Sequence, residues 1–180
     1  ARQAVISSYI NIPQMPTEED RARLELWGNY FGSGMSSVLF QEIREFRAYA
    51  YYSHGYTLTP ALTRYANYPT GFASRMGVQS DKSMAAIEVL DSLYKNMPLR
   101  ENNIAAAKQS EINSINNHYP DFRSMGSIID SYIMKGYTAD PNTAATSIIP
   151  KLGFGDCKKF YDDYVKNRPI IYYIVGNMKT

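Results

Sequence analysis

Strand-like segments at both ends of the chain, with two more placed next to each other in the middle, constrain its fold more than any other feature. Residues 4–12, 48–58, 71–79 and 170–175 are rich in β-branched and aromatic side chains, a composition typical of strands. Stretches with helical spacing separate the middle pair from the outer strands. This arrangement predicts an α+β fold, a two-layer sandwich with helices packed on one face of a mainly antiparallel four-stranded sheet.

Two helices are predicted between the first and second strands. Thr17 is placed to cap the first, because three acidic residues follow it and favour the positive first turn of a helix. That helix should end at the glycine-rich stretch 32–34, and the second should cover about 36–46. The predicted buried face of the second helix consists of Leu39, Ile43 and Phe46, which lie at helical spacing.

The remaining segments complete the predicted order of elements. A link that contains Pro60 and Pro69 joins the two middle strands and is predicted to be an irregular loop. Asp81 is placed to cap the first of the helices that follow, and a short helix over 156–166 precedes the last strand. The resulting order is β-α-α-β-β-α-α-α-β.

The composition fits one folded domain that spans residues 1–180. A chain of this length can bury a sizeable core, and no internal repeat or linker divides it. The net charge of +2, from 19 basic and 17 acidic residues without blocks of like charge, gives no reason to expect nucleic acid or an anionic membrane as partner. No apolar run approaches about 20 residues, the length needed to span a bilayer. Because the chain starts at Ala1 without an initiator Met, we expect it to be a fragment of a longer chain.

The sequence contains no complete catalytic set. Zinc peptidases place two histidines one helical turn apart, with a glutamate that activates water, but His54 and His118 are far apart and neither H-E-x-x-H nor H-x-x-E-H occurs. Cys157 is the single cysteine, and a nucleophile there would need an activating base; its neighbours include lysines but form no signature of a cysteine enzyme, so we expect a structural thiol. We therefore expect this segment to bind no metal or other cofactor by itself. A His–His–carboxylate site assembled by the fold is an open alternative.

Residues 30–55 contain an ordered set of short motifs. The glycine-rich turn at 32–34 is followed by Ser-Ser-Val-Leu-Phe at 36–40, Gln-Glu-Ile-Arg-Glu at 41–45 and Ala-Tyr at 50–51. This stretch closely resembles the insulinase-like (pitrilysin-type) zinc metallopeptidase family. Residues 77–98 and 160–176 resemble the same family in the same order, so that the resemblance extends over nearly the whole chain.

The resemblance implies a division of labour between domains. Members of the family are built from repeated α/β units, as fused halves or paired subunits that enclose a chamber, and one half carries the zinc motif. The other half resembles a degenerate copy, in which an arginine and a tyrosine seven residues apart contact the bound peptide. Arg44 and Tyr51 match that pair. The implied role of this chain is that of a substrate-contacting domain, inactive alone, whose partner domain or subunit holds zinc and whose substrate is a peptide or unfolded polypeptide.

The local pattern is compatible with this role for Arg44 and Tyr51. Arg44 lies off the predicted apolar face of its helix, so its guanidinium can reach out and donate to a substrate carbonyl. Tyr51 alternates with Ala50 and is predicted to share an open strand face with Tyr49 and Ser53. From that face its hydroxyl could stabilise a developing oxyanion.

Other functions are also compatible with the sequence. Ala48 and Tyr49 stand where the family usually has Gly-Leu, and this departure fits a degenerate peptidase-like domain with a purely structural or protein-interaction role. Ala48 and Ala50 are small and are expected to pack closely under helices. An unrelated α+β enzyme with a hidden metal site is a further alternative. Because related domains associate through large surfaces, the isolated chain is also expected to be able to form a homodimer.

Overall fold

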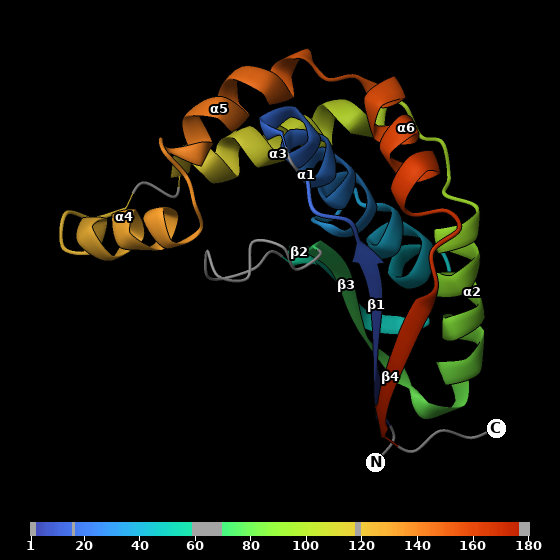
Figure 1. Cartoon of the computed structure of the whole chain (residues 1–180). Coiled ribbons are helices and arrows are strands. Elements are labelled where there is room, and N and C mark those ends of the chain that lie inside the picture. The colour runs from blue at the N-terminus through green and yellow to red at the C-terminus, as the bar shows by residue number, and fades with distance from the viewer. Residues whose placement is uncertain (1–2, 16, 59–69, 118–119, 177–180) are drawn as a thin grey trace.

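The computed structural model describes residues 3–15, 17–58, 70–117 and 120–176 (Figure 1). Its elements are, in order, β1 (Gln3–Ile12), α1 (Glu18–Gly32), the π-helix η1 (Phe40–Glu45), β2 (Ala50–Leu58), β3 (Thr70–Gln79), the 3-10 turn η3 (Ser80–Lys82), α2 (Ser83–Lys95), α3 (Asn103–Asn117), α4 (Met125–Met134), α5 (Pro141–Ile148), the 3-10 turn η4 (Ile149–Lys151), α6 (Phe154–Tyr164) and β4 (Ile170–Gly176).

The four strands form one antiparallel sheet. Their order is β2-β3-β1-β4, and every neighbouring pair runs antiparallel. The helices α1, α2 and α6 lie together beside the sheet, and α4 projects away from it (Figure 1). The predicted α+β sandwich on a four-stranded antiparallel sheet is therefore confirmed.

The alternation along β1 distinguishes the two faces of the sheet. Its even-numbered residues, from Ala4 to Ile12, are at most 2% exposed, and the residues between them reach solvent. Because successive side chains of a strand point to opposite faces, this pattern places the helices against the even-numbered side. The other side of the sheet carries no helix of the described residues.

Trp27 of α1 lies at the centre of the core. Its ring is fully buried and packs against Phe72 of β3, with ring centroids 4.7 Å apart. It also packs against Phe31 of α1 at 5.2 Å and Phe160 of α6 at 5.6 Å. These contacts join two helices and the sheet, and buried aromatic rings of this kind contribute strongly to core stability.

Thr17 caps α1 as predicted. Its hydroxyl accepts a hydrogen bond from the Asp20 backbone N–H at 3.0 Å, and acidic residues fill the first turn. At its other end α1 lies very close to β2, because a methyl group on Gly32 would come within 2.7 Å of the Gly55 Cα. The glycine at each of these two positions permits this backbone approach.

The second predicted helix is mainly the π-helix η1, and this changes which residues are buried. Leu39 and Ile43 are buried as predicted, but Phe46 is 62% exposed. In a π-helix the hydrogen bonds span five residues, as from Phe46 N to Gln41 O at 2.9 Å, so a turn takes up more residues than in an α-helix. The spacing from Leu39 to Phe46 therefore no longer returns to the same face, and the predicted burial of Phe46 was wrong.

The helical block between β3 and β4 contains five α-helices in the described residues, where the predicted order has three. One of the two additional helices, α5, has signals in the sequence, because Asp140 is a favoured N-cap residue and Pro141 suits the first turn. In the structure Asp140 accepts a hydrogen bond from Asn142 N at 2.9 Å. Asp81 does not cap α2; it lies within η3, and Lys82 is the N-cap residue.

None of the described helices is long and apolar enough to cross a membrane. Pro60, Pro69 and His118 lie outside the described residues.

Candidate functional site

Arg44 lies in the last turn of η1 with its side chain exposed. The carbon of its guanidinium is 4.7 Å from the centre of the Phe40 ring, and its Nε is 3.8 Å from a carboxylate oxygen of Glu45. An exposed ion pair of this length contributes little to stability. The ring under Arg44 therefore orients the guanidinium, and most of its N–H groups remain available to another molecule.

A buried carboxylate anchors the helix that carries Arg44. Glu42 is 8% exposed, and its carboxylate accepts a hydrogen bond from Arg47 Nη1 at 2.5 Å and forms an ion pair with Arg100. The Arg100 guanidinium also lies over the Phe46 ring, 5.1 Å from its centre. Through these contacts η1 is fastened to the segment that precedes α3.

Ala48 turns the chain from η1 into β2. Its φ of 51° places it in the left-handed region, where a side chain is unfavourable. The turn is closed by hydrogen bonds from Ala48 N to Arg44 O and from Tyr49 N to Ile43 O, both at 3.0 Å. Ala48 is exposed, so the expectation that it packs under helices was wrong, although Ala50 is buried as expected.

Tyr51 is the extra residue of a β-bulge at the start of β2. Ala50 pairs with Val78 and Tyr52 pairs with Gly77, which leaves Tyr51 without a partner in β3. Tyr51 is 80% exposed and Ser53 is buried, so the prediction that these two share a face was wrong. Simple alternation fails here because a bulge inserts one residue into the two-residue repeat.

Arg44 and Tyr51 are thus both exposed on one continuous segment that runs from η1 through the Ala48 turn into β2. Within the described residues no hydrogen bond joins the two side chains. The segment combines a π-helix, a left-handed residue and a β-bulge, features that are frequent at functional sites.

Next to this segment lies the uncovered side of the sheet, which we call the open sheet face. Across the four strands it is formed by three rows of paired residues: Tyr52, Gly77, Val5 and Val175; His54, Arg75, Ser7 and Tyr173; and Tyr56, Ala73, Tyr9 and Ile171. The rings on β2 follow one another along the strand, with centroid separations of 5.8 and 6.3 Å. Large apolar side chains on β4 are exposed by 53% to 69%. The face is therefore largely aromatic and apolar, with polar side chains in its middle row at Ser7, His54 and Arg75.

Of the residues considered for metal or nucleophilic chemistry, the structure describes His54 and Cys157 but not His118, so the His–His–carboxylate alternative lies partly outside the described residues. His54 stands among aromatic rings on β2. In the described parts of the chain no three His, Cys, Asp or Glu residues are placed to hold a metal ion. Cys157 is buried in α6, and this burial raises the pKa of its thiol to about 12, so that it stays protonated at neutral pH.

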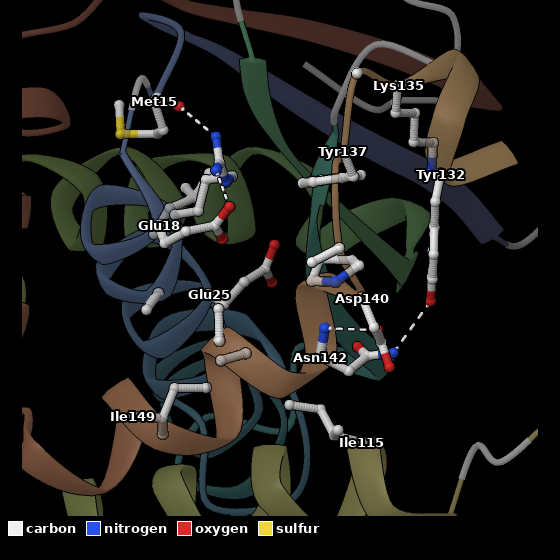
Figure 2. A pocket seen from close by; sticks show the side chains of 18 of the residues that line it. Met15, Glu18, Glu25, Ile115, Tyr132, Lys135, Tyr137, Asp140, Asn142 and Ile149 are labelled. Atoms are coloured by element: carbon white, nitrogen blue, oxygen red, sulfur yellow. Dashed lines mark hydrogen bonds and ion pairs between the residues drawn. The ribbon is translucent and has the colours of Figure 1, made fainter. Parts of the chain in front are cut away.

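A cavity of about 760 Å³ lies away from this segment, between α1, α3 and the segment from the end of α4 through α5 (Figure 2). Glu25 of α1 points into it, and the pKa of its carboxyl is raised from 4.5 to about 7, mainly by burial. The Thr57 hydroxyl lies 3.0 and 3.1 Å from the two carboxylate oxygens and opposes this rise. The sequence contains no signal for the cavity, because three segments far apart in the chain form it.

Comparison by sequence finds no relative: no family model matches the chain, and no curated protein matches it. Comparison of structures does. The peptidase M16 inactive domain from Pseudomonas fluorescens is 13% identical, with a TM-score of 0.74 over 99% of this chain and 42% of that chain. The inactive peptidase domain of a predicted zinc protease from Bordetella parapertussis is 15% identical, with a TM-score of 0.74 over 95% of this chain and 92% of that one.

A third structure of the same fold belongs to a larger assembly. A chain of Complex III2 from Candida albicans is 14% identical, with a TM-score of 0.71 over 98% of this chain and 43% of that chain. At such identities the likeness establishes the fold. That fold is the one found in peptidase M16 inactive domains and in domains of predicted zinc proteases, as the resemblance in the sequence implied. The chain spans less than half the length of two of these three structures.

Proposed function

We propose that this chain is the accessory domain of an insulinase-like zinc metallopeptidase and that it helps complete a peptide-hydrolysis site whose zinc is held by another domain or subunit. The observation that carries the proposal is the joint exposure of Arg44 and Tyr51 on the segment between η1 and β2. Their types and spacing match the pair that contacts peptide in the family. The fold shared with inactive peptidase domains supports the same role.

The two side chains have distinct roles in this proposal. Arg44, oriented by the Phe40 ring, donates to a carbonyl oxygen of the bound peptide. Tyr51 donates its hydroxyl proton in a hydrogen bond to the oxyanion that develops when water attacks the scissile carbonyl. The zinc of the partner domain supplies the Lewis acid and the activated water. Alone, this chain has no turnover.

The open sheet face supports the association that the proposal requires. Its exposed aromatic and apolar side chains would be covered by a partner domain or by an extended polypeptide. The Pseudomonas fluorescens chain is more than twice as long as the part matched here, so a unit of this fold does occur within a longer chain. In our proposal the zinc-bearing unit is either in the same chain or in a separate subunit.

The proposal is tested by zinc-dependent peptide cleavage with the complete native assembly, in which Arg44→Ala and Tyr51→Phe are compared with the parent. We expect turnover to fall by about 10²–10³-fold for Tyr51→Phe, the usual effect of removing one oxyanion donor, and substantially for Arg44→Ala. Zinc content and thermal stability should not change.

Two matched controls make the test specific. Arg123→Ala removes another arginine that lies over a phenylalanine, Phe122, at 5.1 Å, and Tyr164→Phe removes a tyrosine hydroxyl on α6, outside the open sheet face. Both should cleave like the parent. If Arg44→Ala and Tyr51→Phe also match a parent that cleaves, this domain does not contribute to the peptidase site.

A purely structural or protein-interaction role is the second candidate. The occurrence of this fold in a chain of Complex III2 favours it, as does the departure from Gly-Leu at Ala48 and Tyr49. In that case the native assembly would show no zinc-dependent cleavage. The open sheet face would then serve only as a contact surface.

A further inference from the structure

The cavity between α1, α3 and α5 has a carboxylate on one wall and apolar side chains around it. Glu18 and Glu25 of α1 point toward the cavity (Figure 2), and Arg21, three and four residues away from them on the same helix face, also lines it. Ala22, Ile115, Ala145 and Ile149 contribute apolar surface. The volume of about 760 Å³ is in the range of small-ligand sites.

Most charged groups around the cavity already have a partner. Arg21 forms an ion pair with Glu18, donates to the Met15 carbonyl at 3.1 Å and lies 5.5 Å from the centre of the Tyr137 ring. Asp140 caps α5 through the Asn142 N–H. The Arg21 charge is therefore neutralised within the wall and is not directed at Glu25.

Glu25 differs because no cation of the described residues forms an ion pair with it. Its hydrogen-bond donor in the described residues is the Thr57 hydroxyl, which lies within reach of both carboxylate oxygens. A hydroxyl has a single proton, so it can satisfy only one of these oxygens at a time. Glu111 of α3 adds a second negative charge nearby and is itself hydrogen-bonded by Asn29. A carboxylate removed from water in this way lacks the charge partner that such groups ordinarily have.

We propose that this cavity binds an ammonium or guanidinium group carried on an aliphatic chain. The cation pairs with Glu25, and the aliphatic chain lies against the apolar wall. Such a ligand is either a lysine or arginine side chain of a polypeptide or a free amine of the same shape. The peptide source rests on the proposed function, whereas the free amine does not.

The binding should depend on pH through Glu25. Burial raises the pKa of Glu25 to about 7, the neighbouring Glu111 charge adds to the rise, and the Thr57 hydroxyl lowers it. Only the ionised carboxylate attracts the cation, so affinity should fall about tenfold between pH 8 and pH 6. The other charged or titratable groups of the lining are Glu18 and Arg21 of α1 and Tyr132, Lys135, Tyr137 and Asp140 of the segment from the end of α4 to the cap of α5.

The test is calorimetric titration of the 180-residue chain with agmatine, which carries a guanidinium and an ammonium on a four-carbon chain. A parallel titration uses a capped Ala-Arg-Ala peptide. Its uncharged counterpart is the same capped peptide with norleucine in place of arginine. We expect agmatine or the arginine peptide to bind at pH 8 and the norleucine peptide not to bind. Binding of agmatine indicates a free-amine source, and binding of the arginine peptide alone indicates a polypeptide source.

Variants decide whether Glu25 holds the cation. Glu25→Gln keeps the size of the side chain and should weaken binding at least tenfold, whereas the exposed Glu101→Gln should bind like the parent. The double variant Arg44→Ala, Tyr51→Phe should also bind agmatine like the parent, because the cavity does not involve these two residues. Failure of ligand binding in the cavity can therefore be told apart from failure of the proposed peptidase role. The inference is overturned if neither probe binds at millimolar concentration, or if Glu25→Gln folds and binds as tightly as the parent.

Discussion

Ala48 carries the backbone strain of the turn between η1 and β2. Its φ of 51° lies where an L side chain costs about 1–2 kcal/mol, and the chain takes this conformation to pass from η1 into β2. The resemblance in the sequence placed glycine at this position in the family, and the positive φ gives the physical reason. Alanine in place of the family's glycine at position 48 therefore leaves the backbone of this turn strained.

Replacing Ala48 by glycine should stabilise the protein. Relief of the left-handed strain is partly offset by the greater freedom of glycine in the unfolded chain, so we expect the free energy of unfolding to rise by about 1 kcal/mol. Chemical denaturation measures it. The same substitution at Ala105, exposed within α3, should instead lower stability by about 1 kcal/mol. A loss at Ala48 similar to that at Ala105 would contradict the strain assigned to the turn.

Glu25 should make stability depend on pH in a way opposite to an ordinary paired carboxylate. The pKa of its carboxyl is 4.5 when unperturbed and about 7 in the folded protein, so the unfolded state releases its proton first as the pH rises between these values. The folded state consequently loses stability over that window. Glu25→Gln removes the titration and should gain about 3 kcal/mol in free energy of unfolding, relative to the parent, between pH 4.5 and pH 8.

Unfolding titrations at several pH values, without added ligand, check this expectation. Glu88→Gln is the control, because Glu88 is exposed on α2 and its substitution should give a difference that stays nearly constant with pH. If the gain of Glu25→Gln were equally constant, the raised pKa of Glu25 would be wrong.

At the scale of elements, the strands could be predicted from the sequence, whereas the β-bulge at Tyr51 and the π-helix η1 could not. The four strand segments were found at nearly their observed limits because β-branched and aromatic residues cluster there. The bulge at Tyr51 and the π-helix under Arg44 depend on hydrogen bonds such as Tyr49 N to Ile43 O, which only the folded arrangement brings together. A regular helical repeat of 3.6 residues therefore predicts Phe46 to be buried, and a regular strand repeat of two predicts Ser53 to share the exposed face of Tyr51. In the structure Phe46 is exposed and Ser53 is buried.

The same reasoning explains what sequence could say about the candidate sites. Arg44 and Tyr51 were identified through a resemblance in type and spacing, and the structure places both at the surface. Glu25 sits in an amphipathic helix among other charged residues, where its side chain looks like any solvated one. The packing of α3 and α5 over α1 leaves Glu25 without an ion pair among the described residues, and no local sequence pattern indicates that packing.

Glu42 should be the main electrostatic anchor of η1. Its buried carboxylate pairs with Arg47 and Arg100, whose side chains are 38% and 30% exposed. Glu42→Gln leaves both cations without their partner and should lower the free energy of unfolding by about 2 kcal/mol, less than for a fully buried pair. Denaturant unfolding measures the loss. Glu45→Gln removes only the exposed 3.8 Å contact with Arg44 and should change stability by less than about 0.5 kcal/mol; equal effects of the two substitutions would argue against the anchor.

At the scale of the whole molecule, the two faces of the sheet are in different environments. One face is covered by the aromatic core around Trp27, and the open sheet face exposes Ile171, Tyr173 and Val175 of β4. Contiguous exposed apolar surface of this kind is typical of surfaces that contact another molecule. In the proposed peptidase that molecule is the partner domain or the polypeptide substrate.

In the absence of a partner, a second copy of the chain should cover this face. We therefore expect the isolated chain to form a dimer whose population rises with concentration, measured by sedimentation equilibrium. Ile171→Ser with Val175→Ser removes apolar area from the face while leaving the core intact. At roughly 25 cal/mol per Å² of buried apolar surface, the loss should weaken the dimer at least tenfold.

The control for this experiment removes a similar amount of exposed apolar surface elsewhere. Met35 is 75% exposed and Leu99 is 58% exposed, and neither belongs to the open sheet face. Met35→Ser with Leu99→Ser should dimerise like the parent if the contact is specific. Should both double variants weaken the dimer alike, association would be a general property of apolar surface and the open sheet face would have no special part in it. A parent that stays monomeric at millimolar concentration would mean that the face needs a different partner than its own copy.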